Sequence, residues 1–212
     1  MLYPVEAGLE SKYVDEVWVA TDCRDICNTV LDCDTRAKVY KRSEASATDV
    51  SNSEDVLLEF SEKYARQGFS NLGDFDILVF MQCTSPLTEA EDIDGALELL
   101  ESDPTHDSVI SCCEDHGGWL CGGFTWETLG DYYAANRITP YSHQRQEMSK
   151  RYRENGAIYA SYKKDFMEEK TRLPGRIKIF EMPRARSFEI DSKEDLNELD
   201  SLLSPYDPDV PF

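Results

Sequence analysis

Apolar and polar positions follow two periods that alternate along this chain. Short apolar or alternating runs at 17–20, 37–42, 77–81 and 108–113 predict strands, and the run at 77–81 is continuous, as in strands buried on both faces. The segments at 24–33, 53–64 and 88–100 carry apolar residues at helical spacing. This succession of strand and helix predicts an α/β domain with a mostly parallel sheet and right-handed crossovers.

Polar residues before the helical segments indicate where the helices begin. Ser53 is followed by two acidic residues, which suit the positive end of a helix, so we expect it to be an N-cap. We expect Thr88 to cap the next helix, with Glu91 in the capping-box position. Ser192 is expected to cap a final helix that has its leucines on one side.

The pattern changes between about residues 114 and 152. Glycine pairs at 117–118 and 122–123, with few apolar runs, predict an irregular insertion that contains a hairpin near 119–126. The alternation then resumes with a strand at 157–160, a short helix near 163–169 and a strand at 177–180. Because no convincing linker interrupts the chain, we expect a single domain over residues 1–212, with residues 114–152 as its insertion.

Composition and charge reduce the number of classes of binding partner to be expected. The chain has 212 residues and a formal net charge of −20, from 22 basic and 42 acidic residues. Such a surface repels nucleic-acid backbones and anionic membranes, so neither is an expected partner. No apolar run approaches the length of a membrane span, and the first residues lack the features of a signal peptide. Seven cysteines, an odd number, fit reduced thiols and a cytoplasmic location better than a disulfide framework.

Polar side chains follow three of the predicted strands. Thr21 follows the first, Arg42 ends the second, Ser51 and Ser53 open the helix after it, and Gln82 follows the third. Each of them is also explained by an ordinary cap or turn. Because ligands bind beyond the carboxyl ends of the strands in open α/β sheets, their convergence on one edge predicts a binding site there.

Two further clusters lie later in the chain. In an extended segment, Glu189 and Asp191 share one face, where they suit a hard cation such as Mg²⁺ that also binds substrate phosphates. An acidic strand end in an acidic chain explains this pair nearly as well. The other cluster consists of Arg145, Gln146, Arg151, Arg153 and Asn155, in which arginine offers a fork for a carboxylate or phosphate, unless it pairs with the protein's own acids.

Other kinds of site find less support in the sequence. Cys112, Cys113, His116 and Cys121 resemble a set of zinc ligands, but adjacent cysteines on a strand point to opposite faces. The histidines lack a nucleophile motif, and the sequence contains neither G-x-x-x-x-G-K-[ST] nor G-x-G-x-x-G. We therefore expect neither a zinc site nor a hydrolase triad, and no recognisable glycine-rich phosphate cradle is present in the sequence.

Five ordered motifs point to a family. They are VATD at 19–22, ATD at 47–49 followed by SEDVLL at 53–58, QCTSPL at 82–87, RENGAIY at 153–159 and EID at 189–191. Together they resemble the nucleotide-sugar-activating cytidylyltransferases of the acylneuraminate (CMP-sialic acid synthetase) type, from about residue 4 to about residue 203. The segment at 155–159 is more similar to the acylneuraminate branch than to the related 3-deoxy-manno-octulosonate (KDO) cytidylyltransferases.

The resemblance implies a fold, a reaction and partners. The implied fold is a Rossmann-like nucleotidyltransferase three-layer sandwich. The implied reaction joins CMP from CTP to the anomeric hydroxyl of a sialic-acid-like nonulosonic acid and releases pyrophosphate, with Mg²⁺ as cofactor. A homodimer is implied as well, formed through the irregular segment at about 114–152.

The resemblance also implies roles for matching residues on the nucleotide side. Arg42, Ser51 and Ser53 would lie around the cytosine and ribose of CTP. Glu189 and Asp191 would be the catalytic pair that holds Mg²⁺ and helps to deprotonate the attacking hydroxyl.

On the sugar side, three further residues match the family motifs. Gln82 would contact the sugar acid, and Arg145 would lie near its carboxylate, in agreement with the fork argument above. Asn155 belongs to the motif that shapes the sugar side of the pocket.

The chain departs from the family pattern in two places. Glu189 stands where family members usually have aspartate, and its longer side chain would reach a metal with altered geometry. Family members also begin with a strand and a Gly/Ser/Lys/Arg-rich loop that cradles the triphosphate, whereas this sequence begins at the helix that follows them. We expect that strand and loop to be encoded upstream of Met1. The alternatives are a non-catalytic sugar-acid or nucleotide-binding homologue, and a part supplied by another chain.

Overall fold

The computed structural model describes residues 2–34, 36–48, 51–67, 74–114, 125–129, 132–136 and 152–203. The first part contains α1 (Leu2–Glu10), β1 (Trp18–Thr21), α2 (Arg24–Cys33), β2 (Lys38–Lys41), α3 (Ser53–Gln67), β3 (Ile77–Phe80), α4 (Ala90–Glu101) and β4 (Ser108–Glu114). The second part contains β5 (Thr125–Leu129), β6 (Tyr132–Asn136), β7 (Tyr152–Tyr162), α5 (Lys163–Glu169), β8 (Ile177–Glu181), the 3₁₀ turn η2 (Arg184–Arg186) and α6 (Lys193–Leu203). Each strand and helix expected outside the insertion therefore has a counterpart.

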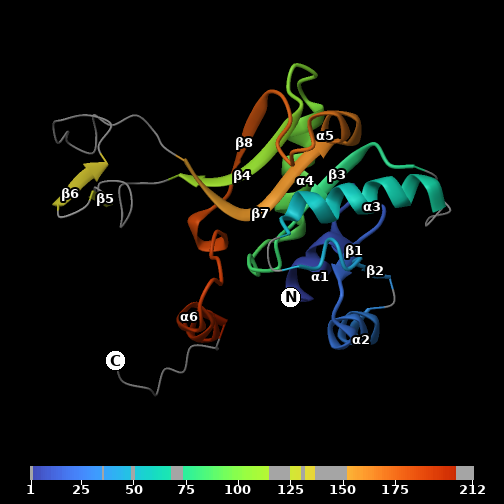
Figure 1. Cartoon of the computed structure of the whole chain (residues 1–212), viewed down its shortest axis with the longest axis horizontal. Coiled ribbons are helices and arrows are strands. Elements are labelled where there is room, and N and C mark those ends of the chain that lie inside the picture. Colours follow the sequence, from blue (N-terminus) through green and yellow to red (C-terminus); the bar gives the residue numbers. More distant parts are fainter. Residues whose placement is uncertain are drawn as a thin grey trace.

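The strands form one four-stranded sheet and two separate pairs (Figure 1). The large sheet has the order β3-β7-β4-β8, in which β4 and β8 are parallel and β7 is antiparallel to both of its neighbours. β1 and β2 form a parallel pair, and β5 and β6 an antiparallel one. The α/β prediction is confirmed. The large sheet is mixed rather than parallel throughout, because β7 pairs antiparallel with β4, an arrangement that needs no crossover helix.

The predicted insertion contains its hairpin later than expected. β5 and β6 pair from Thr125 opposite Asn136 to Leu129 opposite Tyr132, whereas the hairpin was expected near 119–126. Residues 115–124 and 137–151 lie outside the described ranges.

The main apolar core lies between α4 and the large sheet. Ile93, Leu97 and Leu100 of α4 are almost fully buried, together with Val109 of β4 and Ile158 of β7. The helical spacing of apolar residues in α4 creates this buried face. A second, smaller core joins α1 and α2 to the β1–β2 pair.

The starts of α4 and α6 test two of the expected caps. Before α4, Glu89 rather than Thr88 is the capping residue, and its N–H donates to the Asp92 carboxylate at 3.1 Å. Ser192 caps α6 as expected, because its Oγ accepts the N–H of Asp195 at 3.2 Å and its own N–H donates to the Asp195 carboxylate at 2.7 Å. Adjacent polar residues are equally able to cap, so the sequence located the first helix start to within one residue.

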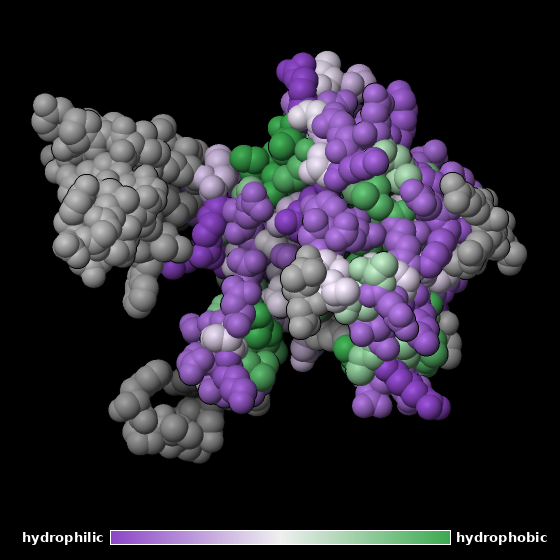
Figure 2. Space-filling model, in the orientation of Figure 1, coloured by the Kyte–Doolittle hydropathy of each residue, from purple (hydrophilic) through white to green (hydrophobic). Residues whose placement is uncertain are grey.

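The surface of the described part is mostly hydrophilic in the view of Figure 2, with apolar residues gathered on part of α6 at the lower left. On that helix Leu199 is buried, whereas Leu196 and Leu202 are 47% and 60% exposed. The apolar side predicted for the last helix is therefore only partly covered. In the ranges that the structure describes, no helix combines the length and the apolarity that crossing a membrane requires.

Candidate active site

A cleft of about 1140 Å³ lies between the β1–β2 pair and the large sheet. The whole of β1 and β3 lines it, and α1, α3 and α4 contribute further side chains. In Figure 1 the β1–β2 pair lies below α3 and the large sheet lies above and behind it. Thr21, Arg42, Ser51, Ser53 and Gln82 all line this cleft, so the residues that follow the first three predicted strands converge as expected.

Arg42 reaches the cleft from the end of β2. Its Nη2 donates to the carbonyl of Ser46, its Nη1 lies 4.0 Å from the Asp22 carboxylate, and its side chain is 24% exposed. Among the described atoms, none is placed to accept a hydrogen bond from its buried Nε. A guanidinium that is held at one end in this way still has N–H donors to offer to an oxygen of a bound ligand.

Glu59 of α3 fastens the turn that carries Arg42. Its carboxylate accepts the Tyr40 hydroxyl at 2.7 Å and the Ser43 hydroxyl at 2.8 Å, and it pairs with Lys63 one turn further along α3. Burial acts to raise the pKa of Glu59, but these donors outweigh burial and lower the pKa from 4.5 to about 2. The carboxylate therefore stays ionised near neutral pH and links β2 to α3 beside the cleft.

Ser51 and Ser53 lie at the start of α3 and have different surroundings. The cap of this helix is Asn52 rather than Ser53, because Asn52 Oδ1 accepts the N–H of Asp55 at 2.9 Å while the Asp55 carboxylate accepts the N–H of Asn52 at 3.1 Å. Ser51 Oγ donates to the carbonyl of Ala45 at 3.0 Å. Ser51 therefore holds the loop while it lines the cleft, and Ser53 lines the cleft from the first turn of α3.

The loop after β3 is tied to β7. The N–H of Gln82 donates to the carbonyl of Gly156 at 3.3 Å, and the Ser85 hydroxyl donates to the carbonyl of Asn155 at 2.9 Å. Ser85 is 1% exposed, so its hydrogen bond is protected from water. These two bonds fix the main chain on which Gln82 is carried.

β7 bulges where it meets this loop. Its pairing with β4 passes from Tyr159 opposite Ile110 to Glu154 opposite Cys112, so residues 155–158 face the single residue Ser111. A bulge bends the strand and redirects side chains from their regular alternation. It turns residues 155 and 156 toward the loop after β3.

Asn155 lies in the core at this bulge, whereas the family resemblance placed it at the sugar side of the pocket. It is fully buried and is not among the described residues that line the cleft. Its Oδ1 accepts the Ser111 hydroxyl at 2.6 Å, and its Nδ2 donates to the Ser187 hydroxyl at 2.9 Å and to the sulfur of Met182 at 3.3 Å. Asn155 therefore joins β7 to β4 and to the segment before Glu189, and its part in binding a sugar acid stays a prediction.

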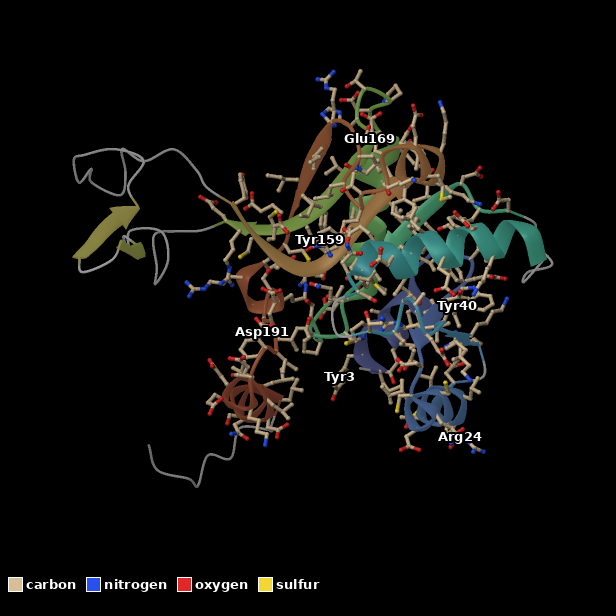
Figure 3. All side chains as sticks on the ribbon, viewed as in Figure 1. Tyr3, Arg24, Tyr40, Tyr159, Glu169 and Asp191 are labelled. Atoms are coloured by element: carbon tan, nitrogen blue, oxygen red, sulfur yellow. The ribbon has the colours of Figure 1, made fainter. Side chains whose placement is uncertain are left out.

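Glu189 and Asp191 lie on the irregular segment between η2 and α6. The N–H of Ile190 donates to the carbonyl of Thr84 at 2.8 Å, and the N–H of Asp191 donates to the Asp195 carboxylate at 3.0 Å. Burial raises the pKa of Glu189, and the negative charge of Asp191 raises this pKa further. Figure 3 shows Asp191 where the chain enters α6. The charge of Asp191 therefore acts on the Glu189 carboxylate, and their joint binding of a metal stays a prediction.

One member of the predicted arginine cluster lies beside this pair. The positive charge of Arg153 lowers the pKa of Glu189 and so opposes the effects of burial and of Asp191. Arg145 and Arg151 lie outside the described residues. The contact of Arg145 with the sugar carboxylate therefore stays a prediction.

Arg186 anchors the segment that carries the carboxylate pair, a role that no sequence motif indicated. Its guanidinium binds the buried carboxylate of Asp92 and lies 3.3 Å from the carboxylate of Glu89. These contacts join η2 to the start of α4. An arginine three residues before Glu189 is the available sequence signal, and it is too common a feature to single out.

The predicted residues form two groups that meet at Gln82. The residues expected on the nucleotide side line the cleft with Gln82, whereas Glu189 and Asp191 are outside the described lining. A Cβ placed on Gly156 would lie within 2.6 Å of side-chain oxygens of both Gln82 and Glu189. The cleft and the carboxylate pair therefore adjoin.

A known protein family matches the part of the chain that forms the cleft and carries Glu189 and Asp191. The family model described as cytidylyltransferase matches residues 1–204. The chain belongs to the cytidylyltransferase family. The match includes the cleft, the loop after β3 and the carboxylate pair, so both parts of the candidate site lie within the family's own region.

Two curated cytidylyltransferases are similar over most of the chain. N-acylneuraminate cytidylyltransferase A of Danio rerio is 29% identical over 192 residues, which is 88% of this chain. The N-acylneuraminate cytidylyltransferase of Streptococcus agalactiae serotype III (strain NEM316) is 28% identical over 204 residues, which is 92% of this chain. The chain spans only 40% and 45% of the length of these two relatives.

A solved cytidylyltransferase-type structure shares the fold. The structure of CMP:2-keto-3-deoxy-manno-octonic acid synthetase complexed with CTP aligns with a TM-score of 0.66 and 18% identity. The alignment covers 96% of this chain and 86% of that one. The Rossmann-like α/β architecture implied by the sequence motifs is therefore confirmed.

Proposed function

We propose that this chain transfers a cytidylyl group from CTP to the anomeric hydroxyl of a sialic-acid-like nonulosonic acid, giving a CMP-sugar and pyrophosphate. One observation carries the proposal: a cleft lined by Arg42, Ser53 and Gln82 adjoins the pair Glu189 and Asp191 within a family match over residues 1–204. The names of the two curated relatives favour an acylneuraminate over KDO as the sugar acid.

CTP is proposed to bind at the end of the cleft that carries Arg42, Ser53 and Gln82, because ligands of open α/β sheets bind beyond the carboxyl ends of the strands. Arg42, which lines it, would place a fixed positive charge beside the ligand in a chain whose net charge is −20. Ser53, with Ser51 behind it in the loop, would offer a hydroxyl to the ribose or base.

The sugar acid is proposed to bind on the Gln82 side. A glutamine amide both donates and accepts hydrogen bonds, which suits the hydroxyl groups of a sugar. Arg145 is proposed to bind the sugar carboxylate, for which the guanidinium fork is well matched.

Glu189 and Asp191 have the chemistry of a Mg²⁺ site. The raised pKa of Glu189, caused by burial and by the charge of Asp191, indicates a carboxylate pair without full counter-charge. Within the described ranges, no cluster of three or more His, Cys, Asp or Glu side chains is in position to hold a metal. Two carboxylates would leave room for phosphate oxygens and water, as Mg²⁺ prefers in nucleotide sites. A bound Mg²⁺ would offset the negative charge of the triphosphate.

The proposed step is a displacement at phosphorus. The oxygen of the anomeric hydroxyl attacks the α-phosphorus of CTP, and a new P–O bond forms. The bond from the α-phosphorus to the bridging oxygen breaks, and pyrophosphate leaves with that electron pair. The hydroxyl proton passes to a carboxylate of the Glu189–Asp191 pair, and a Mg²⁺ ion held there would make the hydroxyl more acidic.

The proposal is tested by incubating this chain, and the longest reading frame that contains it, with CTP, Mg²⁺ and a panel of sugar acids. The panel contains N-acetylneuraminate, legionaminate, pseudaminate and KDO. We expect pyrophosphate and a CMP-sugar, with an acylneuraminate preferred over KDO. If neither protein releases pyrophosphate with any of these acids, the proposal fails.

Two variants with matched controls connect activity to the site. Asp191→Ala should abolish turnover and leave the fold intact, whereas Asp200→Ala, on the exposed surface of α6, should keep full activity. Arg42→Ala should raise the KM for CTP. Arg36→Ala is its control, because Arg36 pairs with Asp34 at 2.7 Å, outside the cleft lining.

A non-catalytic role in binding a sugar acid or nucleotide is the second proposal. It is favoured by the net charge of −20 together with the lack of a recognisable glycine-rich phosphate motif in the sequence. Calorimetry combined with the pyrophosphate assay separates the two: sugar-acid or nucleotide binding without release of pyrophosphate supports the second, and CTP–Mg²⁺ binding with release of pyrophosphate contradicts it. The homodimer and the cytoplasmic location stay predictions, which sedimentation and cell fractionation would test.

A further inference from the structure

Gly156 lies where the side chains of Gln82 and Glu189 meet. Its φ of 64° is in the left-handed region, which glycine adopts at no steric cost. A Cβ at this position would lie 2.3 Å from Oε1 of Gln82 and 2.6 Å from Oε1 of Glu189. Both oxygens therefore pack against the glycine, next to each other.

The backbone of Gly156 and its lack of a side chain have two different roles at this site. The carbonyl of Gly156 accepts the N–H of Gln82, and the neighbouring carbonyl of Asn155 accepts the Ser85 hydroxyl, so the backbone holds the loop after β3. The missing side chain leaves the space into which the ends of Gln82 and Glu189 extend. Gly156 therefore holds the loop after β3 through its backbone, and its lack of a side chain leaves room for the ends of Gln82 and Glu189.

We propose that Gly156 is a positioning residue, whose lack of a side chain sets the Gln82 amide and the Glu189 carboxylate at their working separation. This inference rests on the proposed function, in which Gln82 contacts the sugar acid and Glu189 belongs to the pair that binds Mg²⁺ and accepts the proton. The two atoms that a side chain would meet most closely are the ends of the flexible Gln82 and Glu189 side chains, and the buried Ser85 hydroxyl follows at 3.0 Å. A substitution therefore disturbs the site more than it disturbs the fold.

Gly175 provides a matched control for backbone strain. Its φ of 60° is nearly the same, and a Cβ there would lie 2.1 Å from the Asp107 carboxylate. It lies between α5 and β8, and it is not among the described residues that line the cleft. Gly175→Ala thus imposes the same left-handed strain without touching Gln82 or Glu189.

The test compares the steady-state kinetics and melting temperatures of the wild type, Gly156→Ala and Gly175→Ala. In Gly156→Ala we expect kcat/KM for the sugar acid to fall by about 100-fold, as for a functional group displaced by about 1 Å, with a changed Mg²⁺ dependence. The KM for CTP should stay close to that of the wild type. Gly175→Ala should lower the melting temperature to a similar extent and keep wild-type kinetics. Wild-type kinetics in Gly156→Ala overturn the inference.

A second measurement does not depend on activity. The side-chain amide signal of Gln82 in a ¹⁵N NMR spectrum is assigned by its loss in Gln82→Ala. Gly156→Ala should shift this signal, and Gly175→Ala should not. If the wild type transfers no cytidylyl group, the proposed function fails, and this signal alone decides the inference: an unshifted Gln82 amide overturns it.

A gentler variant covers the case in which Gly156→Ala does not fold. Gly156→Asn carries the same Cβ, but asparagine tolerates the left-handed region better than alanine does. The kinetic and NMR expectations for it are the same. If neither Gly156 variant folds while Gly175→Ala does, the inference is overturned, because Gly156 would then be required for folding rather than for positioning Gln82 and Glu189.

Discussion

The guanidinium of Arg186 and the carboxylate of Asp92 form an ion pair with two hydrogen bonds, Nε to Oδ2 at 2.8 Å and Nη2 to Oδ1 at 2.7 Å. The Asp92 side chain is only 2% exposed. The same carboxylate also accepts the N–H of Glu89 at the start of α4. One buried charge therefore caps a helix and holds the segment that leads to Glu189.

Removing the arginine should strongly destabilise the protein. Arg186→Met leaves the Asp92 charge buried without its partner, which typically costs about 3–5 kcal/mol. We expect a loss of that size in the free energy of unfolding, measured by urea denaturation. Arg184→Met, an exposed arginine in the same turn, is the control and should change the free energy by less than about 0.5 kcal/mol. Equal losses in both variants would contradict this account.

Asn155 should prove to be a structural residue rather than a substrate contact. Asn155→Leu removes the buried hydrogen bonds from Ser111 and to Ser187, and each buried hydrogen bond typically contributes about 1 kcal/mol, although both hydroxyls keep a main-chain partner in Ile158 and Pro183. Thermal and urea unfolding should both show the loss, whereas Asn197→Ala on exposed α6 should not. A variant with native stability and a raised KM for the sugar acid would restore the direct contact that the family resemblance implied.

Glu59 should contribute to the acid sensitivity of the fold. Its pKa is lowered from 4.5 to about 2, so the stabilisation it provides is complete above the unfolded-state pKa and is lost as the pH falls through the folded-state value. Glu59→Gln should therefore be less stable than the wild type near neutral pH. The difference should shrink as the pH falls from about 5 to about 2. A pH-independent difference in unfolding free energy would argue against this role.

The cysteines should divide into two reactivity classes. Cys23, Cys33 and Cys83 are exposed, whereas Cys112 and Cys113 are buried on β4. Burial is the main cause that raises the pKa of Cys112 to about 11, which leaves little thiolate to react. In a mildly alkaline thiol assay the exposed cysteines should react quickly, and the β4 pair only after unfolding in urea. Rapid labelling of Cys112 in the native protein, read by peptide mass spectrometry, would show that β4 opens.

Sequence periodicity was enough to predict the elements, but not all of their pairings. The continuous apolar run of β3 and the helical spacing of α4 are local signals, and both elements formed where they were expected. The place of β7 between β3 and β4 depends on contacts between residues far apart in the chain. A local pattern of apolar residues carries no information about such contacts. The sequence also could not decide between Asn52 and Ser53 as the cap of α3, because both residues have side chains that can cap a helix.

The candidate site was predictable in its residue types and less so in its geometry. The strand-end argument brought Arg42, Ser53 and Gln82 to one cleft, whereas the joint role of Glu189 and Asp191 stays a prediction. Nothing in the string RENGAIY distinguishes a buried amide from one that faces a ligand. The bulge that buries Asn155 and turns the backbone of residue 156 toward the loop after β3 arises only when β7 pairs with β4.

The segment that carries Glu189 and Asp191 has no regular secondary structure, so its order comes from distant residues. Arg186 binds Asp92, which lies 94 positions earlier in the chain. The segment also contacts the loop after β3, and the hydrogen bond between Ser85 and Asn155 joins that loop to β7 across 70 positions. Contacts between residues so far apart are slow to form, because the chain entropy of closing such loops must be overcome first. The sheet pairs residues that are equally far apart, such as Ile77 and Tyr162, so we expect the candidate site and the sheet to form in the same late step of folding. Because the segment has no ladder of hydrogen bonds of its own, we expect it to open before the sheet on heating.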